Sequence, residues 1–516
     1  MKNPHEHDWL QDEVRVGRTG QFLAVGVFLV FLLVPAASLF RPSLRPDPSE
    51  RPAADLKARL AALDEASKKL PLLEQWRRGD QLFATRRLGA GNQRVFAGGD
   101  GWLYYRPDLE AVFGKGPYHL EPPSVAREKA ERAWQPPVPV IKDFAAQLAE
   151  RNIALIFVPV PTKPMVCREG LGLTPGIARP PAWNKAADDL AAAGIGFVDL
   201  FDLMESRGTD AERFLKQDTH WTPATMEAAA RDVAARIGHP SGSGPAPYRV
   251  GSVEREHRGD LAKMLELGET DPVFPPERAT LRRVLDPATG APVTGDPGSD
   301  LVLLGDSFVN VFEDPSLGFG AEGEPSIGAG FASHLALALG RPAQVLAVNG
   351  GGATAVREAF AALSPGRLAK VKTVVWVLSA RDLLLPELPA RRANIEWRKV
   401  GIGKGATEAS PTTSAAELIL TLREASPIED PTLTPYASAI YSALFEDSDG
   451  KEHLVFLWAF RDRKLEPSAT LEPGKRYRLR LVPLESDNAA NRASRIDDLF
   501  RPDLSPSFAN SFEAVE

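Results

Sequence analysis

Short apolar runs alternate with amphipathic stretches through the middle of the chain. The apolar runs are bounded by turn residues, as is typical of buried strands, and lie at residues 153–158, 195–200, 301–304, 344–348 and 373–378. The amphipathic stretches have helical spacing and lie at residues 138–151, 182–193, 223–237, 331–339 and 353–363. Apolar strands separated by helices predict an α/β fold, in which helices cover both faces of a parallel sheet.

Other parts of the chain follow different patterns. Residues 95–105 combine β-formers with a central Gly and Asp turn, which predicts a hairpin, and residues 248–300 are expected to be irregular. Beyond a Gly- and charge-rich stretch, short strands are expected at residues 418–422, 437–445, 454–460 and 477–482. They predict a small β-barrel of the OB-like kind. The polar residues after Glu485 are expected to be loosely ordered.

Residues 22–40 are uncharged and mostly apolar, and they are long enough to span a bilayer. A cleaved signal peptide is the competing interpretation, because the apolar block 22–34 has signal-peptide length. About twenty residues of mixed charge precede this block, which favours an uncleaved anchor. We therefore expect a single uncleaved anchor, with the bulk of the chain outside the cytoplasm.

Composition narrows the function classes. A chain of 516 residues is too long for one core, and its net charge of −7 argues against a nucleic-acid partner. The only cysteine, Cys167, permits neither an intramolecular disulfide nor a Cys-based metal site. The remaining candidates for ligands, His119, His257 and His334, lack metal-like spacing and are expected to be ordinary polar residues. We predict neither a metal nor a cofactor.

Two short motifs carry the candidate chemistry: Asp-Thr-His-Trp at 218–221 and Gly-Asp-Ser-Phe at 305–308. A Ser hydroxyl becomes a useful nucleophile when a His takes its proton and a carboxylate orients that His. In an extended segment, residues two apart project to the same side, so Asp218 and His220 can act together on Ser307. The alternatives are a simple strand-to-loop turn and a helix start with Thr222 as N-cap.

This combination, together with the expected anchor, resembles the alginate O-acetyltransferase AlgJ/AlgX-type family. Further similar segments lie at residues 101–104, 158–163, 259–261 and 376–383, within a resemblance that covers about 95–390. The resemblance implies an SGNH-hydrolase-like domain that acetylates an exopolysaccharide outside the inner membrane. Ser307 would accept the acetyl group, His220 would be the general base and Asp218 would orient it. No coenzyme A site is visible, so a separate membrane-bound protein is expected to present the acetyl group.

Five further residues are candidates for oxyanion or substrate binding. Asn349 and Gly350 follow a strand. In SGNH-like enzymes, an Asn and a Gly at such positions help to bind the oxyanion, although here Asn349 and Gly350 could simply form a tight turn. Arg381 and Lys163 could make a cationic cleft beside Ser307, with a surface ion pair as the alternative for Arg381. Trp221 could stack on a sugar or steady the His220 loop.

These patterns favour an O-acetyltransferase acting on an exopolysaccharide or a cell-envelope glycan. The alternatives are a non-catalytic glycan-binding scaffold of a synthesis machine and an acetylesterase of the same fold. The expected segments are a cytoplasmic end (1–21), an anchor (22–40), a linker and helical spacer (41–90), a catalytic domain (91–390), a linker (391–413), a small β-domain (414–485) and a polar tail (486–516).

Overall fold

The structure is a computed structural model. It describes residues 71–113, 137–238, 247–267, 273–319, 326–384, 397, 399–403, 416–428, 431, 436, 438–461, 464–484, 490, 493–497, 499, 504 and 506–515. The chain divides into two units, Met1–Leu82 and Phe83–Glu516, and helix α3 (Pro71–Leu88) crosses the boundary between them.

The predicted membrane segment, residues 22–40, lies outside the described residues, as do most of the expected spacer and of the linker 391–413. Within the described part of the chain, we find no helix with the length and apolar character needed to cross a bilayer.

A four-stranded parallel sheet forms the centre of the catalytic domain. Its order is β3 (Ala154–Val160), β8 (Thr373–Ser379), β6 (Leu301–Gly305) and β7 (Gln344–Ala347). All neighbouring pairs are parallel, and every residue of β6 is buried. The predicted parallel sheet is therefore confirmed.

One expected strand does not join this sheet. In residues 195–200, Phe197 alone makes a bridge, to Phe157 of β3. The Asp199 carboxylate accepts a hydrogen bond from the Phe201 amide, and helix α9 (Phe201–Glu205) begins there. The chain therefore leaves the edge of the sheet before a ladder can form.

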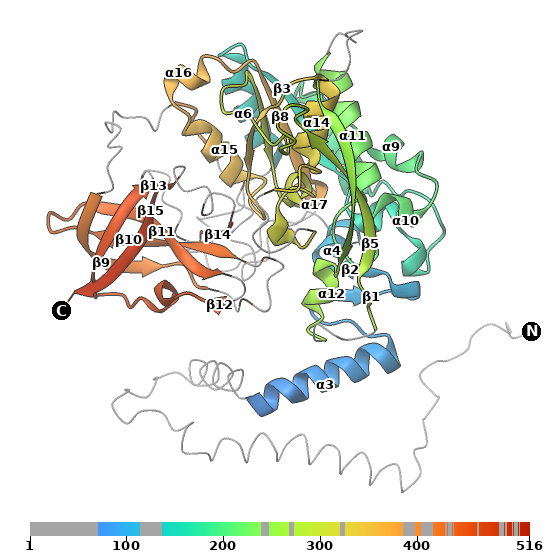
Figure 1. The fold of residues 1–516 in the computed structure, drawn as a ribbon, viewed down its shortest axis with the longest axis horizontal. Helices are drawn as coiled ribbons and strands as arrows, with labels where there is room; N and C mark the ends of the chain where they lie inside the picture. The colour runs from blue at the N-terminus through green and yellow to red at the C-terminus, as the bar shows by residue number, and fades with distance from the viewer. Residues whose placement is uncertain are drawn as a thin grey trace, which may run out of the picture. The chain divides into compact units, whose positions relative to one another are not determined.

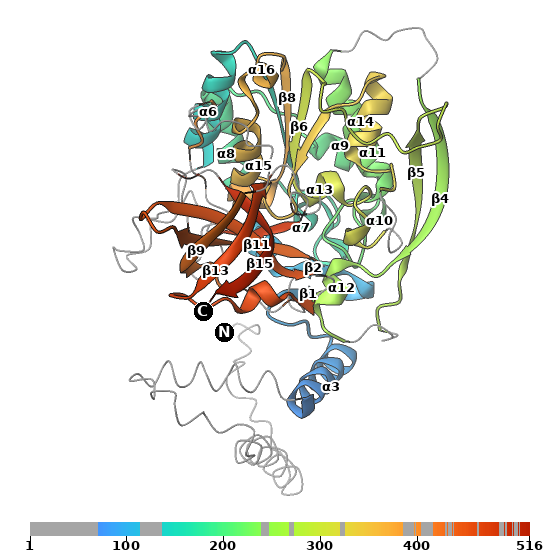
Figure 2. The same cartoon turned by 60° about the vertical axis from the view of Figure 1, so that its left-hand side comes forward.

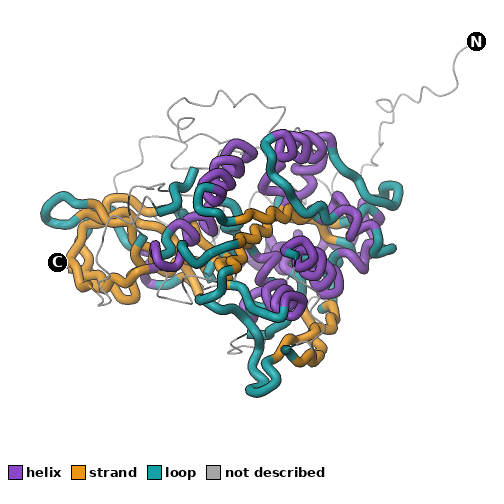
Figure 3. Tube along the Cα trace, turned by 90° about the horizontal axis from the view of Figure 1, so that it is seen from above, coloured by secondary structure: helices purple, strands orange, loops and turns teal. Residues whose placement is uncertain are grey.

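Helices cover both faces of the sheet, as predicted. In Figures 1 and 2, α6 (Pro137–Ala149) and α15 (Thr354–Ala361) lie on one side, and α11 (Pro223–Ile237) and α14 (Phe331–Leu339) lie on the other. Figure 3 shows the same layers from above, with helices on either side of the twisted strands. Thr222 caps α11 by accepting the Thr225 amide, because a side-chain oxygen there satisfies a free N–H of the first turn.

The expected irregular segment instead contains a long antiparallel ribbon. Strand β4 (Arg249–His257) pairs along its whole length with β5 (Glu277–Leu285). Most of β4 is charged or partly exposed, so the ribbon lacks the apolar run that marks a buried strand. The ribbon nevertheless matters for the site. The carboxylate of Glu277 accepts the amides of Lys216 and Gln217, at 2.9 and 2.7 Å.

The C-terminal part is a β-domain, as predicted, and its pairings close on themselves (Figure 3). The closed circuit runs through β11 (Glu452–Arg461), β15 (Ser507–Val515), β13 (Arg476–Pro483), β9 (Ala416–Ala425) and β10 (Ala439–Glu446), which returns to β11. The short strands β12 (Lys464–Leu465) and β14 (Ser494–Ile496) extend it.

The expectation of a loosely ordered tail is wrong for the last residues. Strand β15 joins β13 and β11 and thereby completes the circuit. Its Phe508 is buried and packs edge-on against Trp458, with 5.9 Å between ring centroids. The polar composition hid this strand, because few of its side chains face the interior.

The N-terminal hairpin and helix α7 together hold the loop that carries Asp218. The hairpin is confirmed as β1 (Val95–Ala97) and β2 (Leu103–Tyr105). Lys163 begins α7 (Lys163–Val166) and is fully buried. Its Nζ donates to the backbone carbonyls of Leu103, Lys216 and Asp218, at 2.7, 2.8 and 2.8 Å.

The structure gives Lys163 a structural role in place of the predicted contact with a substrate. All three N–H groups of the ammonium donate to backbone carbonyls, so none is left to donate to a substrate. The ammonium also lies over the rings of Trp102 and Tyr104, at 5.3 and 5.5 Å from their centroids. Burial lowers the pKa of Lys163 to about 8. The similar segments 101–104 and 158–163 therefore meet at one point, beneath the Asp218 loop.

Replacing Lys163 by methionine tests this role. The substitution keeps an apolar stem but leaves three carbonyls without their donor, and a buried unsatisfied group costs about 1–3 kcal/mol. We expect the free energy of unfolding in urea to fall by at least ~3 kcal/mol. The control is Lys185→Met at an exposed pair with Asp189, where the change should stay within about 0.5 kcal/mol. Wild-type stability in Lys163→Met would contradict this structural role.

Candidate active site

The turn after β6 presents Ser307 at the carboxyl edge of the sheet. Ser307 begins the short helix α13 (Ser307–Asn310), and Asp306 is its N-cap. One oxygen of Asp306 accepts the Phe308 amide at 2.8 Å, and the other accepts the Ser379 amide at 3.2 Å. Asp306 therefore ties the Ser307 turn to the end of β8, which explains why a polar residue precedes the Ser.

Ser307, His220 and Asp218 form one continuous hydrogen-bonded chain. His220 Nε2 lies 2.8 Å from Ser307 Oγ, and His220 Nδ1 lies 2.6 Å from Asp218 Oδ1. The three residues are at most 9% exposed. With Nδ1–H donated to the carboxylate, Nε2 is left as the acceptor for the Ser hydroxyl, which is the tautomer that a general base needs. Asp218 Oδ1 also accepts the backbone amide of His220, at 3.1 Å.

Trp221 is part of the protein core. It is fully buried and stacks on Phe331, with 6.0 Å between centroids and 8° between planes. Phe308, the neighbour of the candidate nucleophile, meets the Trp221 ring edge-on at 5.4 Å and the His220 ring at 4.9 Å. Trp221 therefore steadies the His220 loop, which was one of its two predicted roles, and its ring is not open to a sugar.

The segment 259–261 fastens the same loop from the other side. A Cβ at Gly259 would lie 1.9 Å from the Gln217 carbonyl oxygen, so only glycine fits there. The next residue, Asp260, accepts the Thr219 amide at 2.8 Å and the Thr219 hydroxyl at 2.5 Å. Asp260 thus has a clear structural role, which the resemblance of this segment to the family did not reveal.

A second histidine also contacts Asp218. His257, at the end of β4, donates from Nε2 to Asp218 Oδ2 at 2.7 Å, and the Asp260 amide donates to the same oxygen at 3.1 Å. This contact corrects the expectation that His257 is an ordinary polar residue. No local motif marks it, because its partner lies 39 positions earlier in the chain.

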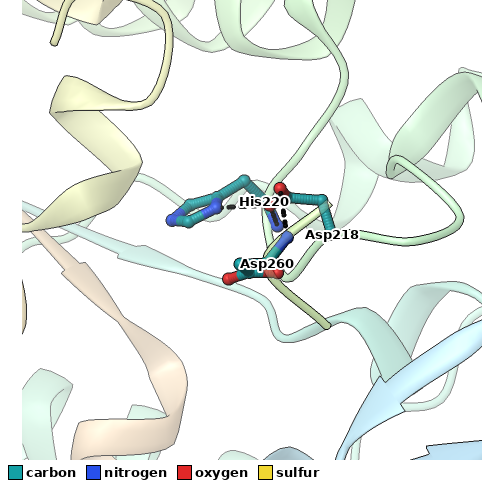
Figure 4. Close-up of side chains that lie close together, drawn as sticks. All are labelled: Asp218, His220 and Asp260. Carbon is teal, nitrogen blue, oxygen red and sulfur yellow. Dashed lines mark hydrogen bonds and ion pairs between the residues drawn. The ribbon is translucent and has the colours of Figure 1, made fainter. Parts of the chain in front are cut away.

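Asp218, His220 and Asp260 also bring together three potential metal-ligating atoms (Figure 4). His220 Nδ1 and Asp218 Oδ1 are 2.6 Å apart, the spacing of a hydrogen bond. Two ligands of a tetrahedral zinc ion, each at about 2.1 Å from it, would lie roughly 3.4 Å apart. Both oxygens of Asp260 accept hydrogen bonds from Thr219. The cluster therefore fits a hydrogen-bonded network better than an ion site.

Electrostatics at this site favour a basic imidazole beside an ionised carboxylate. Burial disfavours the Asp218 charge, but attraction to His220 and the hydrogen bonds from His220 and His257 hold the pKa of Asp218 well below its usual range. Burial likewise favours neutral His220, but Asp218 and, more weakly, Asp260 and Asp306 outweigh this and raise the pKa of His220 above its usual 6.5. The paired carboxylate thus strengthens His220 as a proton acceptor.

Asn349 and Gly350 lie beside the Ser307 helix, past the end of β7. The side-chain oxygen of buried Asn349 accepts from Asn310 of α13 at 2.9 Å. Gly350 has φ +75°, and the Gly351 amide bonds back to Val348, so the predicted tight turn is present. The hydroxyl of Tyr436, from the segment before β10, would lie 3.0 Å from a Cβ at Gly350. The C-terminal domain therefore contacts this turn.

Arg381 is held in an ion-pair cluster next to the site. It lies in α17 (Ala380–Leu384), directly after β8, and its side chain is 21% exposed. Nη1 contacts Asp108 of α4 (Arg106–Phe113) at 2.7 Å, and Nε lies 3.6 Å from Asp382. Its guanidinium also lies over the Tyr105 ring, at 5.3 Å from the centroid. Two carboxylates therefore balance the charge of Arg381, as expected for the alternative in which Arg381 makes an ion pair.

The chain is similar in sequence to known proteins. Two similar curated proteins are probable alginate O-acetylases AlgJ, from Pseudomonas aeruginosa (27% identity over 250 residues) and Pseudomonas syringae (26% over 253 residues). These matches cover 44% and 45% of this chain, and the chain spans 59% of the length of each relative.

Two solved structures are also similar. The O-acetyltransferase domain of Pseudomonas putida AlgJ has a TM-score of 0.40 and 21% identity, over 56% of this chain and 91% of that one. Pseudomonas aeruginosa AlgX has a TM-score of 0.40 and 15% identity, over 72% of this chain and 84% of that one.

The family model described as "SGNH hydrolase-like domain, acetyltransferase AlgX" matches residues 95–380, which is more than half of the 516-residue chain. The chain therefore belongs to the AlgX family of SGNH hydrolase-like acetyltransferase domains.

Proposed function

We propose that this protein is an O-acetyltransferase that uses Ser307, His220 and Asp218 to acetylate a polysaccharide outside the cytoplasm. One observation carries the proposal. The Ser hydroxyl, the imidazole and the carboxylate are joined by hydrogen bonds of 2.8 and 2.6 Å, at the carboxyl edge of a parallel sheet. Ligand sites of open α/β sheets lie at this edge.

The chemistry follows from the order of the three groups. His220 Nε2 takes the proton of Ser307 as Oγ attacks the acetyl carbonyl, and the imidazolium then protonates the leaving group. The resulting ester is the acetylated Ser307. His220 next takes a proton from a sugar hydroxyl, whose oxygen attacks the ester carbonyl. The bond between Ser307 Oγ and the acetyl carbon then breaks, the imidazolium returns the proton to Oγ, and the sugar carries the acetyl group. We assign stabilisation of the oxyanion to the Ser307 amide and to the Asn349 turn beside α13.

The acceptor is assigned by class. The curated relatives carry the name alginate O-acetylase, and we extend only the class, an exopolysaccharide or a cell-envelope glycan, to this chain. The acetyl donor is a separate membrane-bound protein. An acetylesterase would use the same groups with water as the acceptor, and a non-catalytic scaffold would not need the intact triad.

Turnover of p-nitrophenyl acetate tests the catalytic assignment. Removing the nucleophile or the base of a triad costs about a thousandfold or more in rate, so Ser307→Ala and His220→Ala should each lose nearly all turnover. Ser206→Ala, at an exposed serine, is the matched control and should retain the wild-type rate. A fluorophosphonate should label the wild type and not Ser307→Ala. Equal rates in wild type, Ser307→Ala and His220→Ala would contradict the assignment, and glycan binding without labelling would favour the scaffold.

The pH dependence of kcat/KM reports the state of His220. The imidazole must be neutral to accept the Ser proton, so activity should fall as the pH drops through its raised pKa. We therefore expect the acid limb of the profile to lie above pH 6.5, after subtraction of the Ser307→Ala background. An acid limb at or below pH 6.5 would show that Asp218 does not strengthen this base.

We further propose that residues 22–40 anchor the chain in the inner membrane, with the catalytic domain in the periplasm. The support is the uncharged, mostly apolar run in the sequence. The full-length protein should then stay in membranes after a carbonate wash and keep residues 1–21. Recovery of a soluble form that begins near Ala37 would identify the run as a cleaved signal peptide instead.

A further inference from the structure

The carboxylate of Asp218 is shared by two imidazoles, one on each oxygen. Oδ1 accepts His220 Nδ1 at 2.6 Å and the His220 amide at 3.1 Å. Oδ2 accepts His257 Nε2 at 2.7 Å and the Asp260 amide at 3.1 Å. A triad needs a donor on the first oxygen only, so the second imidazole is an addition that the proposed chemistry leaves unexplained.

We propose that His257 is a positioning residue for the triad: by donating to Asp218 Oδ2, it fixes the carboxylate and sets the basicity of His220. This inference rests on the proposed function of Ser307, His220 and Asp218. His257 makes no contact with Ser307 in the described structure and acts through Asp218 alone.

The surroundings of His257 allow one ring orientation. The side chain is 1% exposed, and its ring packs on Phe319, with 4.1 Å between centroids. Gly318 has φ +107°, and a Cβ there would lie 2.3 Å from His257 Cε1 and 2.4 Å from Nδ1. Any side chain at position 318 would therefore collide with the ring, so the glycine leaves the space that the ring fills.

The same surroundings define which nitrogen carries the proton. Among the described residues, His257 Nδ1 has no hydrogen-bond partner, whereas Nε2 faces a carboxylate. A buried N–H without an acceptor is costly, so the proton of a neutral ring belongs on Nε2. Charged groups reach this ring from several elements. Asp218 accepts from Nε2, and the Asp260 amide donates to the same carboxylate. Glu277 lies opposite His257 on the β4–β5 ribbon, Arg255 donates to the Phe319 carbonyl, and Lys263 Nζ would lie 3.0 Å from a Cβ at Gly318.

Two consequences follow for His220. With Oδ2 occupied by a rigid donor, the carboxylate cannot rotate, and Oδ1 stays aimed at His220 Nδ1. The second donor also draws negative charge toward Oδ2. Without it, the carboxylate would attract the imidazolium form of His220 more strongly and raise the pKa of His220 further. A freed carboxylate keeps its full charge beside His220 whichever oxygen faces the ring, while its geometry loosens. Removing the donor should therefore slow the chemical step and move the acid limb of the pH profile upward.

Two variants of His257 separate the loss of its hydrogen-bond donor from the loss of its side-chain volume. His257→Leu removes the donor, while His257→Gln can keep an N–H near the position of Nε2. Losing a group that orients a catalytic ligand typically costs 10–100-fold, as known for residues behind metal ligands. We expect a loss of about this size in kcat for His257→Leu on p-nitrophenyl acetate, with KM within roughly twofold and a higher acid limb. His257→Gln should lie within about threefold of wild type, with the acid limb unmoved.

The matched control is His334→Leu. His334 is also a buried histidine, but its Nε2 lies 2.9 Å from the Arg282 carbonyl oxygen, away from the triad. This variant should change stability without shifting the acid limb. Equal losses in His257→Leu and His257→Gln, or an acid limb that moves in neither, would overturn the proposal. If His257→Leu does not fold, a large kcat loss in folded His257→Gln overturns it by itself.

A second readout does not depend on turnover. The proton between His220 Nδ1 and Asp218 Oδ1 should give a low-field proton NMR signal, and this signal should persist in Ser307→Ala. We expect it to shift in His257→Leu and to return toward its wild-type position in His257→Gln. The signal thus separates the two claims. Wild-type turnover that does not depend on Ser307 would contradict the proposed function, whereas an unshifted signal in His257→Leu would contradict the role of His257.

Discussion

The structure of this site depends on one buried negative charge, the carboxylate of Asp218. A charge removed from water is costly unless donors surround it, and here two imidazoles and two backbone amides supply them. The donors come from three parts of the chain: the loop itself, the end of β4 and the start of α12 (Asp260–Met264). The site is therefore complete only when these three segments are packed together.

Much of the remaining architecture holds the loop that presents this charge. Lys163 donates to the carbonyls of the loop, and Glu277 accepts from the amides of Lys216 and Gln217. Asp260 accepts from the amide and the hydroxyl of Thr219. Each contact uses a buried or half-buried charged group, and hydrogen bonds to ions are stronger than neutral ones. This arrangement pre-organises His220 before a substrate arrives, which is the condition for efficient proton transfer.

The parts that sequence reasoning could predict are those with a local signal. The apolar runs gave the parallel strands, and Asp218, His220 and Ser307 lie together because their motifs sit in a loop and at a strand end. His257 and Lys163 could not be assigned in this way, because their partners lie 39 and 53–60 positions away along the chain. The ribbon β4–β5 and strand β15 were missed for a related reason. The side chains of β4 and β15 are largely exposed, so these strands lack the apolar pattern on which the prediction relied.

The central claim is that Ser307 itself carries the acetyl group between donor and acceptor. Mass spectrometry of the protein quenched during turnover of p-nitrophenyl acetate tests this directly. Peptide mapping should find a mass increase of one acetyl group on the peptide that contains Ser307. The modification should be absent from Ser307→Ala and should disappear when the ester is exhausted. An acetyl group found only elsewhere, or turnover with no acetylated Ser307 at any time, would contradict the account.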